Sequence, residues 1–437
     1  MTDKVDSHRK RKFGWSLLLR LALALVGLLA CYGLSVRAAT VGIARLLLTM
    51  SIAQSRVEPA DRAVRLTPKD PEAHYTRALA LVNLQRLNEA VAEFKQATEL
   101  RPYYYYQWLD LGVTLDRLGN QTDADRALRE SIRLAPNFTQ PHWQLGGLLF
   151  REGKYEEAFA EMRLGAKSDP ALVEGMLTLG WIAADGDIER FEALIQPESR
   201  KTRFELARFL GQQGKGTESA SQLKEVGQPR DEEERKLVRE TISAFLALER
   251  FSDAFDVWSL IHPGSEAGKG KVMNPDFVDS ILADDPGFGW QIRNPPNVVV
   301  SIDPAGPTRS TRSLRIEFSG ETSMTSPVID QLVLLDSKGH YSLSFMARTE
   351  KLVSGAPPVV VVSAAGDNSS KTLGQSNALS SDSAGWTAYS VDFSTEERTL
   401  GIVIGVRRLL CNQVPCPIFG KLWLSQFSLE KKTDARD

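Results

Sequence analysis

Several residue types and motifs that define common functional classes are scarce in this chain. It has only 3 cysteines and 5 histidines in 437 residues, too few for a zinc framework or a dense disulfide scaffold. Lys+Arg 53 and Asp+Glu 55 leave a net charge of -2. This balance gives no field that would draw a polyanion onto the whole molecule, so we expect no nucleic-acid partner. The 42% hydrophobic and 25% charged residues are typical of globular domains and exclude a collagen-like or multi-span membrane chain.

Catalytic motifs are also missing. The sequence contains no His-Glu-x-x-His, no Gly-x-Ser-x-Gly and no phosphate loop ending in Gly-Lys-Ser/Thr. Asp284 and Asp285 are adjacent, but neighbouring acids in a loop are usually solvated, and glycosidase carboxylates stand roughly 5–10 Å apart across a cleft. We therefore predict no catalytic residue, no metal site, no cofactor and a non-enzymatic role.

The N-terminus has the charge pattern of a membrane anchor. A basic tail at 1–12 precedes an apolar segment at 13–36. The uninterrupted part, Leu21 to Val36, is short for a ~30 Å hydrocarbon layer, but Arg20 and Arg37 at its ends can extend to the two interfaces. Positive charge before the span predicts a cytoplasmic N-terminus. We expect a single-pass protein of the bacterial inner membrane, with its bulk periplasmic or otherwise extracytoplasmic.

Two alternatives use the same residues. Val36-Arg37-Ala38 is a candidate cleavage site for a secretory signal peptide, although the apolar segment exceeds the usual 7–15 residues. Leu28-Leu29-Ala30-Cys31 resembles a bacterial lipoprotein box, with an unusual leucine before Ala30. Each alternative still exports or attaches the rest of the chain.

The middle of the chain repeats with a period of 34 residues. Prolines recur at this spacing as Pro68, Pro102, Pro136 and Pro170, and alanines as Ala90, Ala124 and Ala158. One repeat reads Trp108-x2-Leu111-Gly112-x2-Leu115, and His142 begins the same pattern in the next, as His74 does in the one before. This pattern resembles the tetratricopeptide repeat, a pair of antiparallel helices whose small residues permit close approach.

The resemblance is best over 71–170 and weaker on both sides. Val41 to Ser55, with Ala63 and Pro68, reads as a degenerate first pair, and atypical pairs continue to Ile261 as a cap. We therefore predict helical repeats over 37–261, followed by a linker at 262–271 that is rich in Gly and Pro.

The resemblance implies a protein-binding groove lined by the first helix of each pair. Aromatic and apolar residues lie in this groove beside a short row of cationic residues at equivalent repeat positions. This combination is suited to binding an extended peptide or an acidic segment of a partner. The predicted groove residues are Tyr75, Asn83, Tyr106, Leu109, Asp116, Arg117, Trp143, Phe150 and Arg151.

Period-two and short apolar runs from Asn297 onward predict eight strands. Asn274-Pro275-Asp276-Phe277, Gly289-Trp290, Gly385-Trp386 and Lys421-Leu422-Trp423-Leu424 resemble the galactose-binding-like jelly rolls that include carbohydrate-binding modules. The resemblance covers 272–431, before a short tail at 432–437, and makes Trp290, Trp386 and Trp423 candidates for saccharide contacts or for buried core aromatics. Ser425 replaces the aspartate common in that family, which leaves calcium binding open.

Cys411 and Cys416 lie five residues apart just before the last strand. In an oxidising compartment we expect a disulfide, with free thiols as the alternative, because the spacing fits neither a redox pair nor a zinc ribbon.

The predicted fold is thus multidomain: one transmembrane helix, an all-α tetratricopeptide solenoid and an all-β jelly-roll sandwich. The architecture resembles anchored repeat proteins that accompany cell-envelope polysaccharide assembly or export, with protein and polysaccharide as partners. The alternative is a general periplasmic scaffold whose β-domain is structural, and an envelope hydrolase would need an active site that the sequence does not show.

Overall fold

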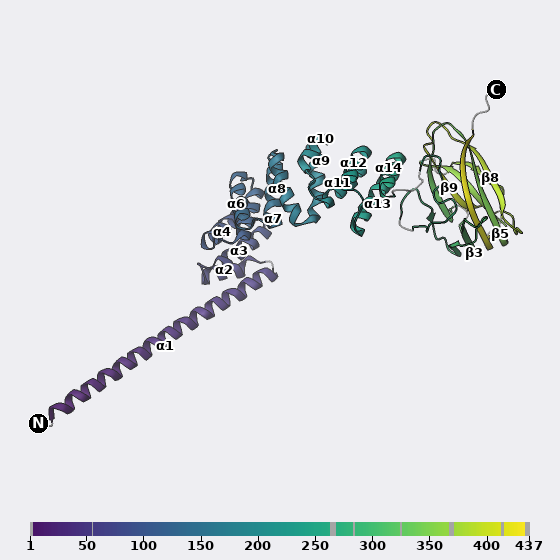
Figure 1. Ribbon diagram of the computed structural model, residues 1–437. Helices are drawn as coiled ribbons and strands as arrows, with labels where there is room; N and C mark the ends of the chain where they lie inside the picture. Colours follow the sequence, from purple (N-terminus) through teal and green to yellow (C-terminus); the bar gives the residue numbers. More distant parts are fainter. Residues whose placement is uncertain are drawn as a thin grey trace. The chain divides into compact units, whose positions relative to one another are not determined.

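The computed structural model describes residues 3–54, 56–262, 268–282, 285–323, 326–366, 371–411 and 415–432. Helices form the N-terminal part and antiparallel strands the C-terminal part (Figure 1), as predicted. The chain divides into two compact units, Met1–Gln196 and Pro197–Asp437. The centre of the expected linker at 262–271, nearly all of the tail at 432–437 and the side chains of the basic tail at 1–12 lie outside the described residues.

The first unit begins with a single long helix, α1 (Asp3–Gln54). Its apolar part, Leu19–Gln54, is long and apolar enough to cross a membrane. The helix does not end near residue 36, where the sequence places the end of the span. Neither Gly33 nor Gly42 interrupts the helix. Its 52 residues give a length of about 78 Å at 1.5 Å per residue.

The last turns of α1 join the repeat array. Ala44 and Leu48 pack on Ala60 and Ala63 of α2 (Val57–Leu66) and on Ala73 of the next helix. The degenerate first pair therefore exists, and its first helix is continuous with the apolar span.

Three regular helix pairs follow: α3 (Pro71–Asn83) with α4 (Leu87–Leu100), α5 (Tyr105–Arg117) with α6 (Gln121–Leu134), and α7 (Thr139–Arg151) with α8 (Tyr155–Ser168). Glycine permits close approach inside two of these pairs. A Cβ at Gly112 would stand 2.7 Å from Leu128 Cγ, and one at Gly146 would stand 2.7 Å from Met162 Cγ. One further pair, α9 (Val173–Ala184) with α10 (Ile188–Ile195), completes this unit after a short turn, η1 (Pro170–Leu172).

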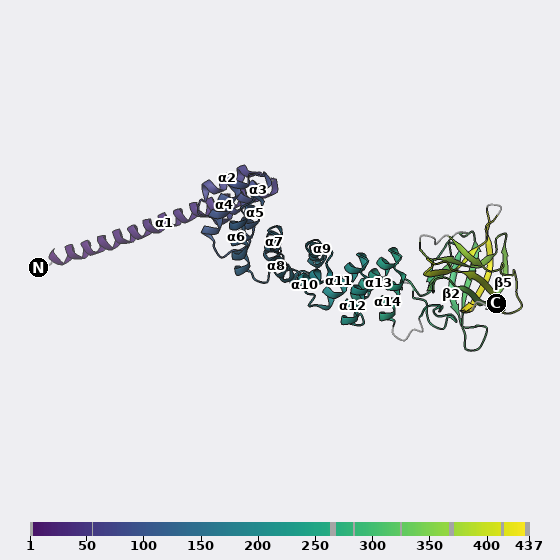
Figure 2. The same cartoon turned by 90° about the horizontal axis from the view of Figure 1, so that it is seen from above.

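The described part of the second unit contains four more helices: α11 (Arg200–Gln212), α12 (Gly216–Val226), α13 (Glu232–Ala247) and α14 (Phe251–Ile261). They lie side by side in Figure 2. Their apolar core, including Ile242 and Trp258, also contains Phe288 and Leu334 from the β-region. These helices therefore group with the strands, because one apolar core contains residues from both sides of the predicted linker. The sequence, in contrast, places the domain boundary at 262–271.

The strands that the structure describes form a sandwich of two antiparallel five-stranded sheets, ordered β1-β4-β9-β6-β7 and β2-β3-β10-β5-β8. All eight expected strands are present together with two short ones, β1 and β7. The strands are β1 (Gln291–Ile292), β2 (Val298–Asp303), β3 (Ser313–Gly320), β4 (Ile329–Leu334), β5 (His340–Ser354), β6 (Pro358–Ala364), β7 (Thr372–Gln375), β8 (Thr387–Ser394), β9 (Gly401–Arg408) and β10 (Ile418–Lys432). Alternate residues such as Leu314, Phe345 and Leu424 fill the core between the sheets.

Candidate functional site

An aromatic cluster occupies the N-terminal end of the predicted groove. Tyr75 and Tyr106 meet edge to face with ring centroids 5.0 Å apart, and Tyr104 meets Tyr106 at the same distance. The Tyr75 hydroxyl donates to Asp110 Oδ2 at 2.6 Å, which joins one repeat to the next. Burial raises the pKa of Tyr75, and the Asp110 hydrogen bond adds to the increase. The cluster is therefore a preorganised surface of neutral, hydroxyl-bearing rings.

The two arginines predicted to lie in the groove also connect successive repeats. Arg117 donates from Nη2 to Gln85 Oε1 at 3.0 Å. Arg151 forms an ion pair with Asp116, one of the other predicted groove residues. The charge of Arg151 is therefore compensated, whereas Arg117 forms no ion pair within the part of the chain that the structure describes.

The remaining groove candidates lie on the same first helices. Asn83 is exposed at the end of α3, whereas Leu109 and Trp143 are half-buried. A Cβ at Gly175 would lie 3.4 Å from the Trp143 ring, so Trp143 packs toward α9. Phe150 contacts Tyr155 and Phe159 of α8, with centroids 5.3 and 6.2 Å away. Phe150 therefore contributes mainly to packing within its own repeat.

The histidines at the repeat seam have structural bonds. His74 Nε2 lies 3.0 Å from the Pro68 carbonyl and its Nδ1 lies 2.7 Å from Glu93. His142 makes the equivalent contacts with Pro136 and Glu161. Both residues are buried, and their hydrogen bonds give them a packing role at the seam between the helices of each repeat.

The three candidate tryptophans of the β-domain have different environments. Trp290 is 3% exposed and packs on Phe277 and Phe427 in the core, which supports the second of its two predicted roles, a buried core aromatic, over a saccharide contact. Trp386 is half-buried beside β8. Trp423 is only 4% exposed, but it lies on the outer face of its sheet because its neighbours Leu422 and Leu424 enter the core.

The structure joins Cys411 and Cys416 in a disulfide, with an S–S distance of 2.13 Å. Arg408 is buried beside it and donates to the Cys416 carbonyl at 2.8 Å and to the Thr322 carbonyl at 3.1 Å. Burial lowers the pKa of Arg408. The sequence did not predict that Arg408 is buried, because the pattern of a strand does not indicate which charged side chain points into the protein.

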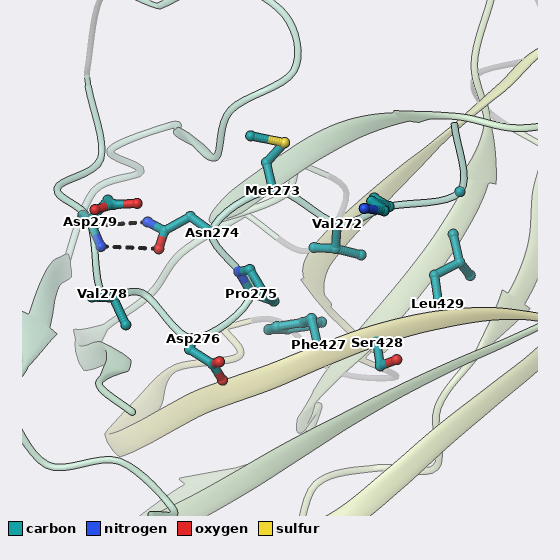
Figure 3. Close-up of a pocket in the computed structure, with 12 residues that line it drawn as sticks. Val272, Met273, Asn274, Pro275, Asp276, Val278, Asp279, Phe427, Ser428 and Leu429 are labelled. Atoms are coloured by element: carbon teal, nitrogen blue, oxygen red, sulfur yellow. Dashed lines mark hydrogen bonds between the residues drawn. The ribbon is translucent and has the colours of Figure 1, made fainter. Parts of the chain in front are cut away.

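A cavity of about 650 Å³ lies between residues 270–279 and strand β10 (Figure 3). The Asn274 side chain closes one end by bonding the Asp279 backbone N–H and carbonyl at 3.1 and 2.8 Å. One oxygen of Asp276 is buried without a hydrogen-bond partner in the described structure. The Ser425 hydroxyl donates to the Arg312 carbonyl at 2.6 Å. Among the described residues, no group of three or more His, Cys, Asp and Glu side chains forms a metal site.

Asp285 differs from the expectation of a solvated carboxylate. It accepts from Trp258 Nε1 at 3.0 Å and lies 3.5 Å from His262, which stacks on the same tryptophan. Burial raises the pKa of Asp285. Its expected neighbour Asp284 lies outside the described residues. The carboxylate thus holds α14 against the start of the β-domain, a contact that only the tertiary structure creates.

Comparisons with known proteins define the class of the helical region. The tetratricopeptide repeat family matches residues 71–104 and 109–172. The helical N-terminal half therefore contains a tetratricopeptide solenoid, and the repeats predicted over 71–170 are confirmed.

Individual relatives resemble only part of the chain. Interferon-induced protein with tetratricopeptide repeats 3 of Mus musculus is 29% identical over 101 residues, which are 22% of this chain and 25% of that protein. The chain thus spans about a quarter of that relative. Two solved repeat structures are similar: MamA 41-end from Desulfovibrio magneticus RS-1 (20% identity, 37% of this chain, 98% of that chain, TM-score 0.30) and YrrB, a TPR protein with an unusual peptide-binding site (21%, 37%, 88%, 0.31).

Proposed function

We propose that this chain is a membrane-anchored extracytoplasmic adaptor in cell-envelope polysaccharide assembly or export. It binds protein partners through the first-helix surface of its repeats and glycan through its β-sandwich. The observation that carries the proposal is the first-helix surface of the repeats. Tyr106 at the start of α5 packs on Tyr75, which bonds Asp110 across the repeats, and Arg117 at the end of α5 is an exposed cation without a carboxylate partner in the described chain.

The chemistry of this surface indicates an extended peptide with acidic side chains. A carboxylate can replace the neutral Gln85 amide as the partner of Arg117, and charge-assisted bonds are roughly twice as strong as neutral ones. The tyrosine cluster of Tyr75, Tyr104 and Tyr106 supplies large, rigid contact area of the kind enriched in binding hot spots. The anchor supports the same proposal, since α1 passes directly from the apolar span into the repeats.

Site-specific crosslinking tests the groove. A photoreactive residue introduced at exposed Asn83 should trap a discrete protein partner in native envelope membranes, and Arg117→Glu should reduce that product by about tenfold or more. Arg126→Glu is the matched control, because Arg126 is 73% exposed on a second helix, α6. Arg151→Glu is less suitable, since a carboxylate at 151 would face Asp116. Equal crosslinking in both charge-reversal variants would contradict the proposed groove.

A second candidate is a general periplasmic scaffold whose β-domain is only structural. The burial of Trp290 and the shared core of α13, α14, Phe288 and Leu334 favour it. Glycan-array and calorimetric titration of the purified chain distinguish the two, since a structural sandwich binds no saccharide even at millimolar concentration.

A further inference from the structure

A row of side chains crosses the outer face of the sheet β2-β3-β10-β5-β8. Trp423 on β10 lies opposite Arg315 on β3 and opposite Arg348 on β5. Directly paired residues in a sheet share one face. Trp386 continues the row beside Arg348, because its neighbour Thr387 pairs with Ala347. The order across the sheet is therefore Arg315, Trp423, Arg348, Trp386.

The two tryptophans hold one guanidinium group between them. Arg348 Cζ lies 4.1 Å from the ring centroid of Trp423 and 5.8 Å from that of Trp386. Trp423 is itself fixed, since its Nε1 donates to Asp303 Oδ2 at 2.9 Å. Such cation–π contacts stabilise the charge of the guanidinium but use none of its N–H donors.

The neighbouring charges on this face are already paired. Arg315 forms an ion pair with Glu317, and Lys421 lies 3.8 Å from Glu350. The Asp303 carboxylate accepts from Trp423 and from the Ala305 N–H at 2.9 Å. Within the described part of the chain, Arg348 donates no hydrogen bond and has no carboxylate within ion-pair distance; its charge acts at longer range on Asp303, where it helps to lower the pKa of the carboxyl group. Arg348 is thus a positioned cation with an unused donor fork.

We propose that this row is the glycan site of the β-domain and that it selects acidic sugars, namely saccharides built from uronic acid. A uronic acid carries two groups on one sugar ring that this row can bind, a carboxylate and an apolar C–H face. Its carboxylate matches the guanidinium fork of Arg348, and the C–H face of its pyranose ring can stack on the half-buried Trp386. The inference rests on the proposed glycan-binding function and specifies its ligand. Because the net charge of the chain is -2, selection comes from this local cation and not from the overall field.

Calorimetry with the full chain tests the proposal. The probe is trigalacturonate, and its methyl ester is the neutral comparison with the same backbone. We expect the ester to bind about tenfold or more weakly, and Arg348→Gln and Trp386→Ala to weaken trigalacturonate binding by a similar factor. Arg348→Lys keeps the charge and the packing stem but loses the fork, so it should retain only part of the affinity. Arg398→Gln, at an exposed arginine of the same domain, should have no effect.

Thermal melting of each variant separates lost binding from lost folding. Equal affinity for the acid and the ester overturns the selection of acidic sugars while leaving glycan binding intact. Wild-type affinity in folded Arg348→Gln protein overturns the assignment of the row. Absence of binding to both probes overturns the row together with the glycan part of the proposed function, whereas the protein-binding part depends only on the crosslinking at Asn83.

Discussion

At the residue scale, one repeat position shows how different side chains fulfil one requirement. At this position a ring nitrogen lies about 3 Å from the carbonyl oxygen of the proline that recurs every 34 residues. The distances are 3.0 Å from His74 to Pro68, 2.8 Å from Trp108 to Pro102 and 2.9 Å from His142 to Pro136. A histidine has a second nitrogen that needs a partner, and Glu93 and Glu161 supply it. The indole of Trp108 has no second nitrogen, and the residue 34 positions after Glu93 is Ala127, which has no side-chain acceptor.

This arrangement predicts a pH-dependent contribution from His74. A carbonyl and an ionised carboxylate can only accept, so His74 makes both hydrogen bonds together when both ring nitrogens carry a proton, which is the charged form of the ring. The hydrogen bond to Glu93 is the main cause of the raised pKa of His74. A raised pKa in the folded state means that the stabilisation is complete below the unfolded value of about 6.5 and is lost as pH rises through the higher folded value.

His74→Trp, the residue of the second repeat, should remove this dependence. The variant keeps a donor for Pro68, and Glu93 keeps its bond from Arg77 at 2.6 Å. We expect the melting temperature of the wild type to fall relative to the variant as pH rises above about 6.5, by roughly 2–4 °C for each kcal/mol lost. Because His142 is present in both proteins, the difference isolates His74. Parallel curves across this range would contradict a charged His74.

At the scale of elements, the helix pairs depend on glycine at the point of closest approach. A Cβ at Gly146 would stand 2.7 Å from Met162 Cγ and 3.0 Å from the backbone oxygen of Ala158. The next residue, Gly147, faces away, and its Cβ would stand 3.5 Å from the flexible end of Arg151. Adjacent glycines on α7 thus have different roles that the sequence does not separate.

Substituting both glycines with alanine separates these roles. Gly146→Ala should cost about 1–3 kcal/mol, because the fixed backbone of α8 blocks the added methyl group. Gly147→Ala should stabilise the helix by roughly 0.5–1 kcal/mol, because it removes backbone entropy from the unfolded chain. Chemical denaturation of the two variants provides the measurement. A stabilising Gly146→Ala would show that α7 and α8 are less closely packed than the structure indicates.

At the scale of the whole molecule, the charge asymmetry around α1 sets the expected compartment. The basic residues before the apolar span should remain in the cytoplasm, which places everything after it on the other side. A reporter active only outside the cytoplasm, fused after Asp437, should therefore give signal, and a cytoplasm-only reporter should not. Non-reducing peptide mapping gives a second readout, since Cys411 and Cys416 should be bonded in an oxidising compartment. Free thiols at both positions, or the reverse reporter pattern, would place the bulk of the chain in the cytoplasm.

The sequence by itself determined the features that depend on local periodicity. The 34-residue spacing from Pro68 to Pro170 fixed the helix pairs, because each repeat carries its own small residues, seam residues and stop. The alternation of apolar residues fixed the eight main strands, since residues on one face of a strand recur with period two. The apolar N-terminal segment predicted a membrane span, and among the described residues α1 alone is long and apolar enough to cross a membrane.

Only the tertiary structure decided how distant residues combine. Tertiary packing placed Trp290 in the core, whereas Trp423, which is almost equally buried, lies on the outer face of its sheet. Strand pairing brought Arg348 to Trp423, 75 positions further along the chain. Repeat stacking paired Arg151 with Asp116 and left Arg117 without a carboxylate partner in the described chain. The physical reason is common to all three: strand register and helix stacking join residues that are far apart in sequence, and local periodicity carries no information about which of them meet.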